Sequence, residues 1–337
     1  MKQNSTSAFH TALQPVSRRL KPVLEDLPEH IKESAQEIRL RVNRPISIFN
    51  GVQSFFVTGN GISRIPQEGI TVFREDMDET FQNLCSHSVY THQNEIKNGF
   101  ITIRGGHRVG ICGTAVLEQG EITGLRDISS FNIRVARQVE GAADDILTKV
   151  GDEILRGILL AGAPSTGKTT ILRDIARQLS CGDEVPPRKI VVIDERGELA
   201  GTYQGDAQND LGCCCDVLDG YPKSQGILQA IRSLSPEIIL CDELGGEKET
   251  AAVEEVVNAG VSIIVSVHAS SAGDLLRRRQ VRRLLETGAF RTVVLLDSAA
   301  QPGKIKGIYK VGELLGQINR DSGSGSSLYS GGLYGIA

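Results

Sequence analysis

One short segment, residues 158–170, constrains the fold of this chain more than any other feature. Four apolar residues lead into Gly-Ala-Pro-Ser-Thr-Gly-Lys-Thr, which fits the pattern G-x-x-x-x-G-K-[ST] known as Walker A. Its two glycines let the main chain curl, so that successive N–H groups can face one anion. The apolar residues that follow recur at helical spacing, and the N-terminus of a helix attracts negative charge. The segment therefore predicts a phosphate-binding loop between a buried strand and a helix.

This loop is the predicted binding site for ATP and Mg²⁺. We expect Lys168 to place an ammonium near the β- and γ-phosphates, and Thr169 to offer its hydroxyl to the Mg²⁺ ion. The predicted nucleotide-binding residues are Gly162, Ala163, Pro164, Ser165, Thr166, Gly167, Lys168, Thr169 and Thr170.

Polar side chains also follow three other apolar runs, where parallel strands would end. Asp242 and Glu243 follow one run, Asp194 and Glu195 a second, and His268 a third. An acid pair after a strand is typical of the Walker B motif of ATPases. Asp242 is therefore predicted to bind the Mg²⁺ shell and Glu243 to activate the attacking water. We expect His268 to sense the γ-phosphate at the same edge of the sheet.

The rhythm of apolar runs divides the chain into three predicted parts. Residues 1–150 combine short alternating strands with broken helical patterns, which predicts a smaller α+β domain. Over residues 151–318, β-branched runs alternate with helical patterns, which predicts an α/β domain with a mostly parallel sheet buried on both faces. Nucleotide then binds at the carboxyl ends of the strands. Residues 319–337 are rich in Gly and Ser and are predicted to form a flexible tail.

Composition and charge narrow the classes of function. A net charge of −4 gives no general argument for nucleic acid or an anionic membrane as the partner. No apolar run approaches the ~18 residues that cross a bilayer. The N-terminal residues also lack the apolar segment of a signal peptide. A cytoplasmic protein that reaches membranes only through partner proteins is expected.

Two local features have less specific interpretations. The adjacent residues Cys213, Cys214 and Cys215 lack the spacing of zinc ligands, so we expect them to be structural or incidental thiols. The basic run 277–283 is typical of a solvated helix face or a subunit contact.

The order of these motifs resembles that of the secretion and traffic ATPases, the motors of type II and type IV secretion systems and type IV pili. The shared order is the phosphate loop, an acidic box at 194–198, Arg232 before Ser-Pro-Glu, the acid pair, and a Ser-Val-His-Ala box. Within that superfamily, the stretches at 194–198, 216–220 and 105–110 make the chain most similar to the stage III sporulation AA family of endospore-forming bacteria.

The resemblance implies a RecA-like doubly wound domain in a hexameric ring, where the N-terminal domain of one subunit closes over the nucleotide. It implies catalytic roles for Lys168, Glu195, His268 and Arg232 beside Glu243. Arginines of the N-terminal domain reach the phosphates in such motors. The candidates in this chain, in order of preference, are Arg104, Arg108, Arg134 and Arg137. Many traffic ATPases have Gly-Glu where this chain has Asp242-Glu243, so its metal shell is closer to that of general P-loop ATPases.

The resemblance further implies that the chain energises a secretion-like channel between mother cell and forespore, with membrane proteins as partners on the mother-cell side. Two other functions remain open at this point. A nucleic-acid translocase would use a channel lined by aromatic and basic residues, whereas only 4% of this chain is aromatic and Trp is absent. A nucleotide-gated scaffold with little turnover would not need Glu243.

Overall fold

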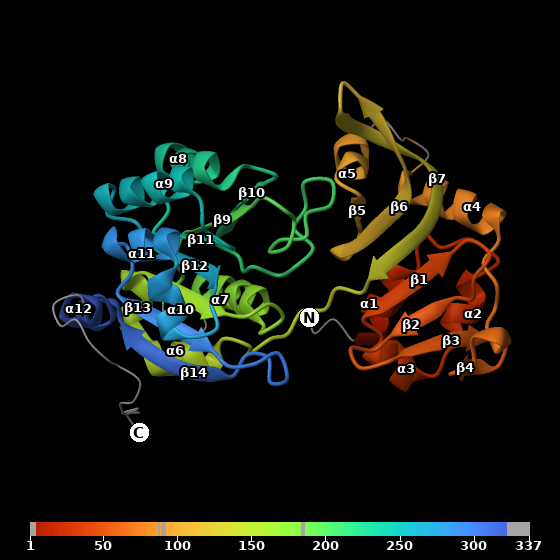
Figure 1. The fold of residues 1–337 in the computed structure, drawn as a ribbon, viewed down its shortest axis with the longest axis horizontal. Coiled ribbons are helices and arrows are strands. Elements are labelled where there is room, and N and C mark those ends of the chain that lie inside the picture. Colours follow the sequence, from red (N-terminus) through yellow and green to blue (C-terminus); the bar gives the residue numbers. More distant parts are fainter. Residues whose placement is uncertain (1–4, 87, 89–91, 183–185, 322–337) are drawn as a thin grey trace. The chain divides into compact units, whose positions relative to one another are not determined.

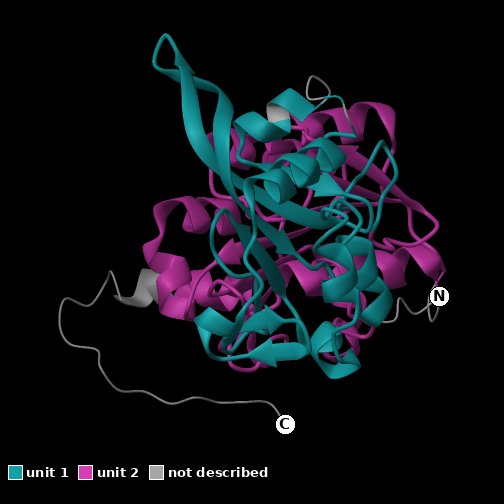
Figure 2. Cartoon of the chain, turned by 90° about the vertical axis from the view of Figure 1, so that its right-hand side faces the viewer, with its two compact units in different colours: residues 1–138, 201–208 teal, residues 139–200, 209–337 magenta. Residues whose placement is uncertain are grey.

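The computed structural model describes residues 5–86, 88, 92–182 and 186–321 (Figure 1). The chain divides into two compact units, which are coloured separately in Figure 2. Unit 1 holds residues 1–138 and 201–208, and unit 2 holds residues 139–200 and 209–337. Most of the predicted Gly/Ser-rich tail, residues 322–337, lies outside the described residues.

Unit 1 is built on an antiparallel sheet with the strand order β4-β3-β2-β1-β7-β6-β5. The strands are β1 (Glu37–Arg41), β2 (Ser47–Phe49), β3 (Ser54–Thr58), β4 (Gly61–Ser63), β5 (Phe100–Ile103), β6 (His107–Glu118) and β7 (Glu121–Arg134). The helices are α1 (Ser5–Ala12), α2 (Lys21–Glu25), α3 (Glu29–Ser34), α4 (Arg74–Leu84), α5 (Gln93–Lys97) and the 3₁₀ turn η1 (Pro66–Glu68).

Alternation of apolar and polar residues explains this sheet. In β1, Ile38 and Leu40 are buried while their neighbours are only half-buried, so one face of the strand meets the core. The outer half of the β6–β7 hairpin is exposed and extends beyond the rest of the sheet (Figure 1).

The Gly-Gly-His stretch at 105–110 is explained by a tight turn between β5 and β6. Gly105 and Gly106 have φ of +86° and +71°, a backbone conformation that favours glycine. A Cβ atom at Gly105 would stand 2.7 Å from Nε2 of His107. The His107 ring is fully buried, and its Nδ1 accepts a hydrogen bond of 2.9 Å from the Ala136 N–H. His107 therefore has a structural role in unit 1.

We expect His107 to make the protein less stable in mild acid. Burial, with a smaller effect of the Arg137 charge, lowers its pKa from 6.5 to about 4 in the folded state. Between these values the unfolded chain binds a proton that the folded chain does not, so stability falls as pH falls from 6.5 to 4. The loss reaches roughly 3 kcal/mol, at about 1.4 kcal/mol for each tenfold change in proton affinity.

Urea unfolding of the full chain at several pH values measures this loss. His107→Asn keeps an acceptor near the Nδ1 position and should flatten the pH dependence over that window. His30→Asn, at an exposed position of the same unit, serves as the matched control and should keep the wild-type slope. If the stability of the His107→Asn variant depends on pH as strongly as that of the wild type, His107 is not the source of the pH dependence.

Unit 2 is built on a sheet with the strand order β10-β9-β11-β12-β8-β13-β14, in which only β14 is antiparallel to its neighbour. The strands are β8 (Ile158–Gly162), β9 (Ile190–Asp194), β10 (Cys215–Asp219), β11 (Ile238–Cys241), β12 (Ser262–His268), β13 (Thr292–Leu296) and β14 (Ile305–Lys310). The helices are α6 (Asp144–Val150), the 3₁₀ turn η3 (Gly151–Arg156), α7 (Lys168–Cys181), α8 (Lys223–Ser233), α9 (Glu247–Asn258), α10 (Ala272–Arg277), α11 (Arg279–Glu286) and α12 (Val311–Asp321).

Helices cover both faces of this sheet and create two cores. Ile158 and Leu160 pack on the side of α6 and α7, whereas Leu159 and Ala161 pack on the side of α8 to α12. A strand buried on both faces must be apolar throughout, which is why β8 has no alternation. The predicted α/β class with a mostly parallel sheet after a separate α+β part is confirmed. No helix within the described ranges is long and apolar enough to cross a bilayer.

Candidate functional site

The predicted phosphate loop joins β8 to α7, and its own hydrogen bonds fix its shape. Thr166 Oγ1 donates to the Ala163 carbonyl at 2.8 Å, and the Thr166 carbonyl accepts from the Gly303 N–H at 2.9 Å. A Cβ atom at Gly162 would stand 2.5 Å from Thr166 Oγ1, so only glycine fits there. Gly167 has φ of +92° and lies directly before α7. Both glycines of the motif are therefore required by the geometry.

The remaining loop residues differ in their accessibility. Pro164 and Ser165 are exposed, and Ser165 has φ of +63°. Thr169 and Thr170 are half-buried in the first turn of α7, where main-chain N–H groups lack helical partners.

The Lys168 ammonium is buried against the loop itself. Nζ donates to the carbonyl oxygens of Gly162 at 2.9 Å and Ala163 at 2.8 Å, and lies 3.2 Å from Nδ1 of His268. Burial lowers the pKa of Lys168, and the charge of Glu243 acts in the opposite direction. A phosphate group would offer this ammonium stronger acceptors than two carbonyls.

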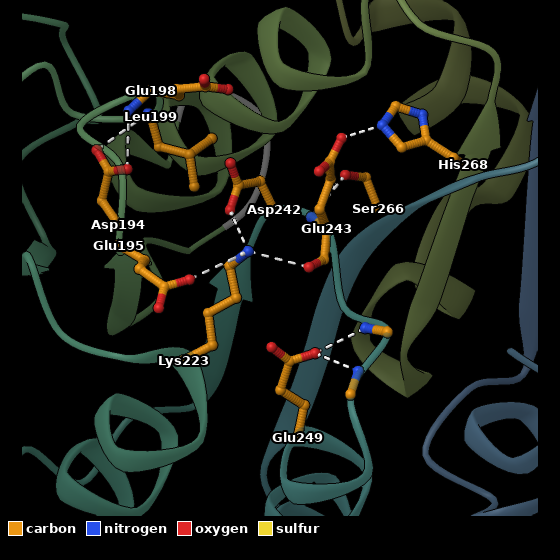
Figure 3. Close-up of polar contacts among 12 residues, drawn as sticks. Asp194, Glu195, Glu198, Leu199, Lys223, Asp242, Glu243, Glu249, Ser266 and His268 are labelled. Atoms are coloured by element: carbon orange, nitrogen blue, oxygen red, sulfur yellow. Dashed lines mark hydrogen bonds and ion pairs between the residues drawn. The ribbon is translucent and has the colours of Figure 1, made fainter. Parts of the chain in front are cut away.

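His268 connects Lys168 to Glu243. The histidine ends β12, and its Nε2 is in contact with the Glu243 carboxylate, as Figure 3 shows. Because an ammonium can only donate, Nδ1 of His268 is the acceptor for Lys168, and Nε2 is the nitrogen that donates to Glu243. The three predicted residues therefore form a continuous polar chain from the phosphate loop to the proposed base.

The backbone at Glu243 is held from several sides. Its N–H donates to Ser266 Oγ at 3.1 Å. The next turn is fixed by Glu249, whose carboxylate accepts from the N–H groups of Gly245 at 2.6 Å and Gly246 at 2.7 Å (Figure 3). Glu243 has φ of +28°, which a side chain other than glycine adopts at a cost in energy. Such outliers are concentrated at functional sites.

Asp194 shapes the acidic box by accepting main-chain hydrogen bonds. Its carboxylate is fully buried and accepts from the N–H groups of Glu198 at 2.9 Å, Leu199 at 3.0 Å and Ala200 at 2.7 Å (Figure 3). Burial raises the pKa of Asp194 to about 6, against the effect of these hydrogen bonds. Asp194 is thus a positioning residue, and it fixes the turn that follows Glu195.

Lys223 is a member of this site that the sequence patterns did not identify. It is the first residue of α8 and is only 4% exposed. Nζ lies 3.3 Å from Asp242 Oδ1 and 3.7 Å from Glu195 Oε2, and donates to the Glu243 carbonyl at 3.0 Å (Figure 3). One ammonium therefore contacts three of the four acidic residues that the sequence predicted for this edge of the sheet, and it reaches Glu243 through the main-chain carbonyl.

The donor set at Asp242 fits a magnesium ion. Oδ1 of Asp242 is buried, and it has the ion pair with Lys223 but no hydrogen-bond partner among the described residues. Mg²⁺ prefers oxygen ligands and keeps one or two carboxylates together with waters and phosphate oxygens. Asp242 and the Thr169 hydroxyl are the residues that would hold it. Within the described ranges no cluster of three or more His, Cys, Asp or Glu could bind a metal without such additional ligands.

The predicted arginines lie on α8 of unit 2 and in unit 1. Arg232 is exposed on α8, nine residues after Lys223, which is roughly 13 Å along a helix axis. In unit 1, Arg104 and Arg134 are exposed, while the Arg108 guanidinium stacks on the Phe100 ring at 3.6 Å.

Arg137 has a structural role in unit 1. Its guanidinium donates to the carbonyl oxygens of Ala35 at 2.6 Å and Lys32 at 2.8 Å, at the end of α3. These bonds satisfy main-chain groups that a helix terminus leaves without partners, so Arg137 is the weakest of the four candidates for a phosphate contact. The other assignments of arginines stay predictions.

The predicted basic run borders the site through a cavity of about 590 Å³. Glu243 and His268 line one side of it, and Arg278, Arg279 and Arg283 from the α10–α11 region line another. Arg283 also pairs with Glu247 at 3.0 Å. The run 277–283 is therefore adjacent to the proposed base.

Comparisons with known proteins were consistent in both sequence and fold. The family model described as "Sporulation stage III, protein AA" matches residues 10–315. The chain is 40% identical over 291 residues to Stage III sporulation protein AA of Bacillus subtilis (strain 168), covering 86% of this chain and 91% of that protein. It is 33% identical over 188 residues to the uncharacterized protein ycf45 of Porphyra purpurea, covering 54% of this chain and 30% of that protein. Among solved structures, the ATPase DotB of Legionella pneumophila shares the fold, with a TM-score of 0.51 and 16% identity over 77% of this chain and 72% of DotB.

Proposed function

Since the chain belongs to the stage III sporulation protein AA family, as its motifs predicted, we propose that it is an ATPase that energises a secretion-like membrane complex during endospore formation. The observation that carries the proposal is the polar chain from Lys168 through His268 to Glu243, with Asp242 beside it. A protein that only bound nucleotide would need the loop but not a carboxylate aligned behind it.

The geometry supports a sequence of events at the phosphate loop. ATP would place its phosphates in the curl of the loop, and the Lys168 ammonium would exchange the carbonyls of Gly162 and Ala163 for phosphate oxygens. That exchange would alter the contact between Lys168 and His268. Because His268 also contacts Glu243, the surroundings of the Glu243 carboxylate would change as well. Glu243 would then accept a proton from the water that attacks the γ-phosphate. Mg²⁺, held by Thr169 and Asp242, would supply positive charge at the phosphate oxygens.

The proposal extends to assembly and location. We propose a hexameric ring on the mother-cell side of the channel to the forespore, attached through membrane proteins that are its partners. In this assembly Arg104, which is exposed, would contact the nucleotide of a neighbouring subunit. Arg232 and the basic run 277–283 would lie at contacts between subunits or with partners.

Phosphate release from ATP by the full chain tests the activity. The assay is best run in the presence of Mg²⁺ and with the protein in molar excess over ATP. Even slow turnover in the absence of partners is then detected. Mass in solution is measured in parallel with and without nucleotide, and a shift to about six subunits is expected. Binding of ATP without any release would favour the scaffold, and stimulation by single-stranded DNA with salt-dependent binding would favour the translocase.

A further inference from the structure

Lys223 occupies a position that ordinary protein energetics disfavours. A cation at the first position of a helix opposes the helix dipole. A buried ammonium is also costly unless it is paired. Lys223 is nevertheless the first residue of α8 and almost completely buried. Its location therefore depends on the anionic oxygens around it.

The surroundings of Lys223 match those of a bound cation. Its Nζ has oxygen neighbours from three places in the chain: the Asp242 carboxylate, the Glu195 carboxylate and the Glu243 carbonyl, at 3.3, 3.7 and 3.0 Å. The ammonium thus lies between two carboxylates and one main-chain carbonyl.

We propose that Lys223 is a built-in cation of the metal site, which holds Asp242 and Glu195 together in the nucleotide-free protein and prevents Mg²⁺ from binding there without ATP. The inference rests on the proposed function, because it takes Asp242 as the metal ligand. With the triphosphate bound, phosphate oxygens would add ligands that the protein alone does not supply, and Asp242 would then exchange its contact with Lys223 for one with Mg²⁺.

Lys223 also links the metal end of the site to the proposed base. The same ammonium that pairs with Asp242 donates a hydrogen bond to the Glu243 carbonyl, and Glu243 is the residue with the unusual φ of +28°. A shift of the ammonium away from Asp242 therefore changes the support of the Glu243 peptide. Lys223 acts as a positioning residue that makes the alignment of the base depend on the arrival of the metal.

Thermal unfolding of the nucleotide-free full chain with and without MgCl₂ tests the inference. The wild-type melting temperature should not respond to Mg²⁺ alone. Lys223→Gln should lower the melting temperature, and millimolar Mg²⁺ should restore at least about 2 °C of the loss, because the exposed carboxylates now bind the ion. Lys223→Arg keeps the charge and should remain insensitive to Mg²⁺. Lys32→Gln, at a buried and ion-paired lysine of unit 1, is the matched control and should show no Mg²⁺ response.

The outcomes separate this inference from the proposed function. A destabilised Lys223→Gln variant that ignores Mg²⁺ would reduce Lys223 to a structural role, whether or not the wild type hydrolyses ATP. A wild type that is already stabilised by Mg²⁺ alone would also overturn the inference. If Lys223→Gln does not fold, the double variant Lys223→Gln/Asp242→Asn, which has lost both charges of the pair, should recover folding. Failure of both variants to fold would contradict the pairing.

Discussion

Glu243→Gln is expected to leave ATP bound while phosphate release falls by about 10²–10⁴-fold, the usual contribution of a general base. The amide keeps the size of the side chain and can still accept a hydrogen bond from Nε2 of His268, but it cannot take a proton from water. Calorimetry of ATP binding and single-turnover phosphate release measure the two effects separately. Because the substitution retains most contacts, ATP affinity should change by less than about tenfold.

The matched control for this variant is Glu247→Gln. Glu247 lies four residues later and is exposed, and its carboxylate pairs with Arg283 on the surface. Surface pairs of this kind contribute at most about 1 kcal/mol, so release by the control should equal that of the wild type. If the Glu243→Gln variant releases phosphate as fast as the wild type, Glu243 is not the base, and no residue of the chain is then assigned to activate water.

Lys168→Ala is expected to weaken ATP binding by roughly 100-fold. The ammonium is the charged donor of the loop, and two charge-assisted hydrogen bonds of about 1.5 kcal/mol each account for that factor. The alanine also leaves the carbonyls of Gly162 and Ala163 without their donor, so the loop should lose order. Calorimetry with ATP and Mg²⁺ provides the measurement.

Lys248→Ala provides the comparison, since Lys248 is an exposed lysine on α9. Its affinity for ATP should match that of the wild type. Normal ATP binding by the Lys168 variant would show that the loop at 162–169 does not bind phosphate, and the proposed function would then fail at its first step.

The sequence predicted most of the unit 2 sheet because its central strands are buried on both faces. Such strands are continuous apolar runs, and the polar residue that ends each run marks the edge where ligands bind. Asp242, Glu243, Asp194, Glu195 and His268 were all located in this way, since the runs before them are β11, β9 and β12. The role of each residue within that group depends on its hydrogen bonds, and the spacing of residues in the sequence does not reveal these.

The sequence patterns did not predict the two edge strands of the unit 2 sheet. β10 and β14 lie at the two edges of the sheet and are only partly buried, so their polar residues hide the strand pattern. The C-terminal helix α12 was missed too, since its end runs into the Gly/Ser-rich segment.

Lys223 was missed because a lysine at the start of a helix is normally solvated. Only the fold shows that α8 begins against the acidic residues. Pro222, two residues after Gly220 and directly before α8, was the available signal, because it marks a helix start at the same edge of the sheet.

The position of β12 has a mechanical consequence. This strand is hydrogen-bonded to β8 on one side and to β11 on the other, with His268 in register with Gly162. If the loop moves when nucleotide binds, β12 is the single hydrogen-bonded strand that would carry this movement to the acid pair. In a force-generating ring, such a connection would couple ATP binding to ATP hydrolysis within each subunit, so that neither event could occur independently of the other.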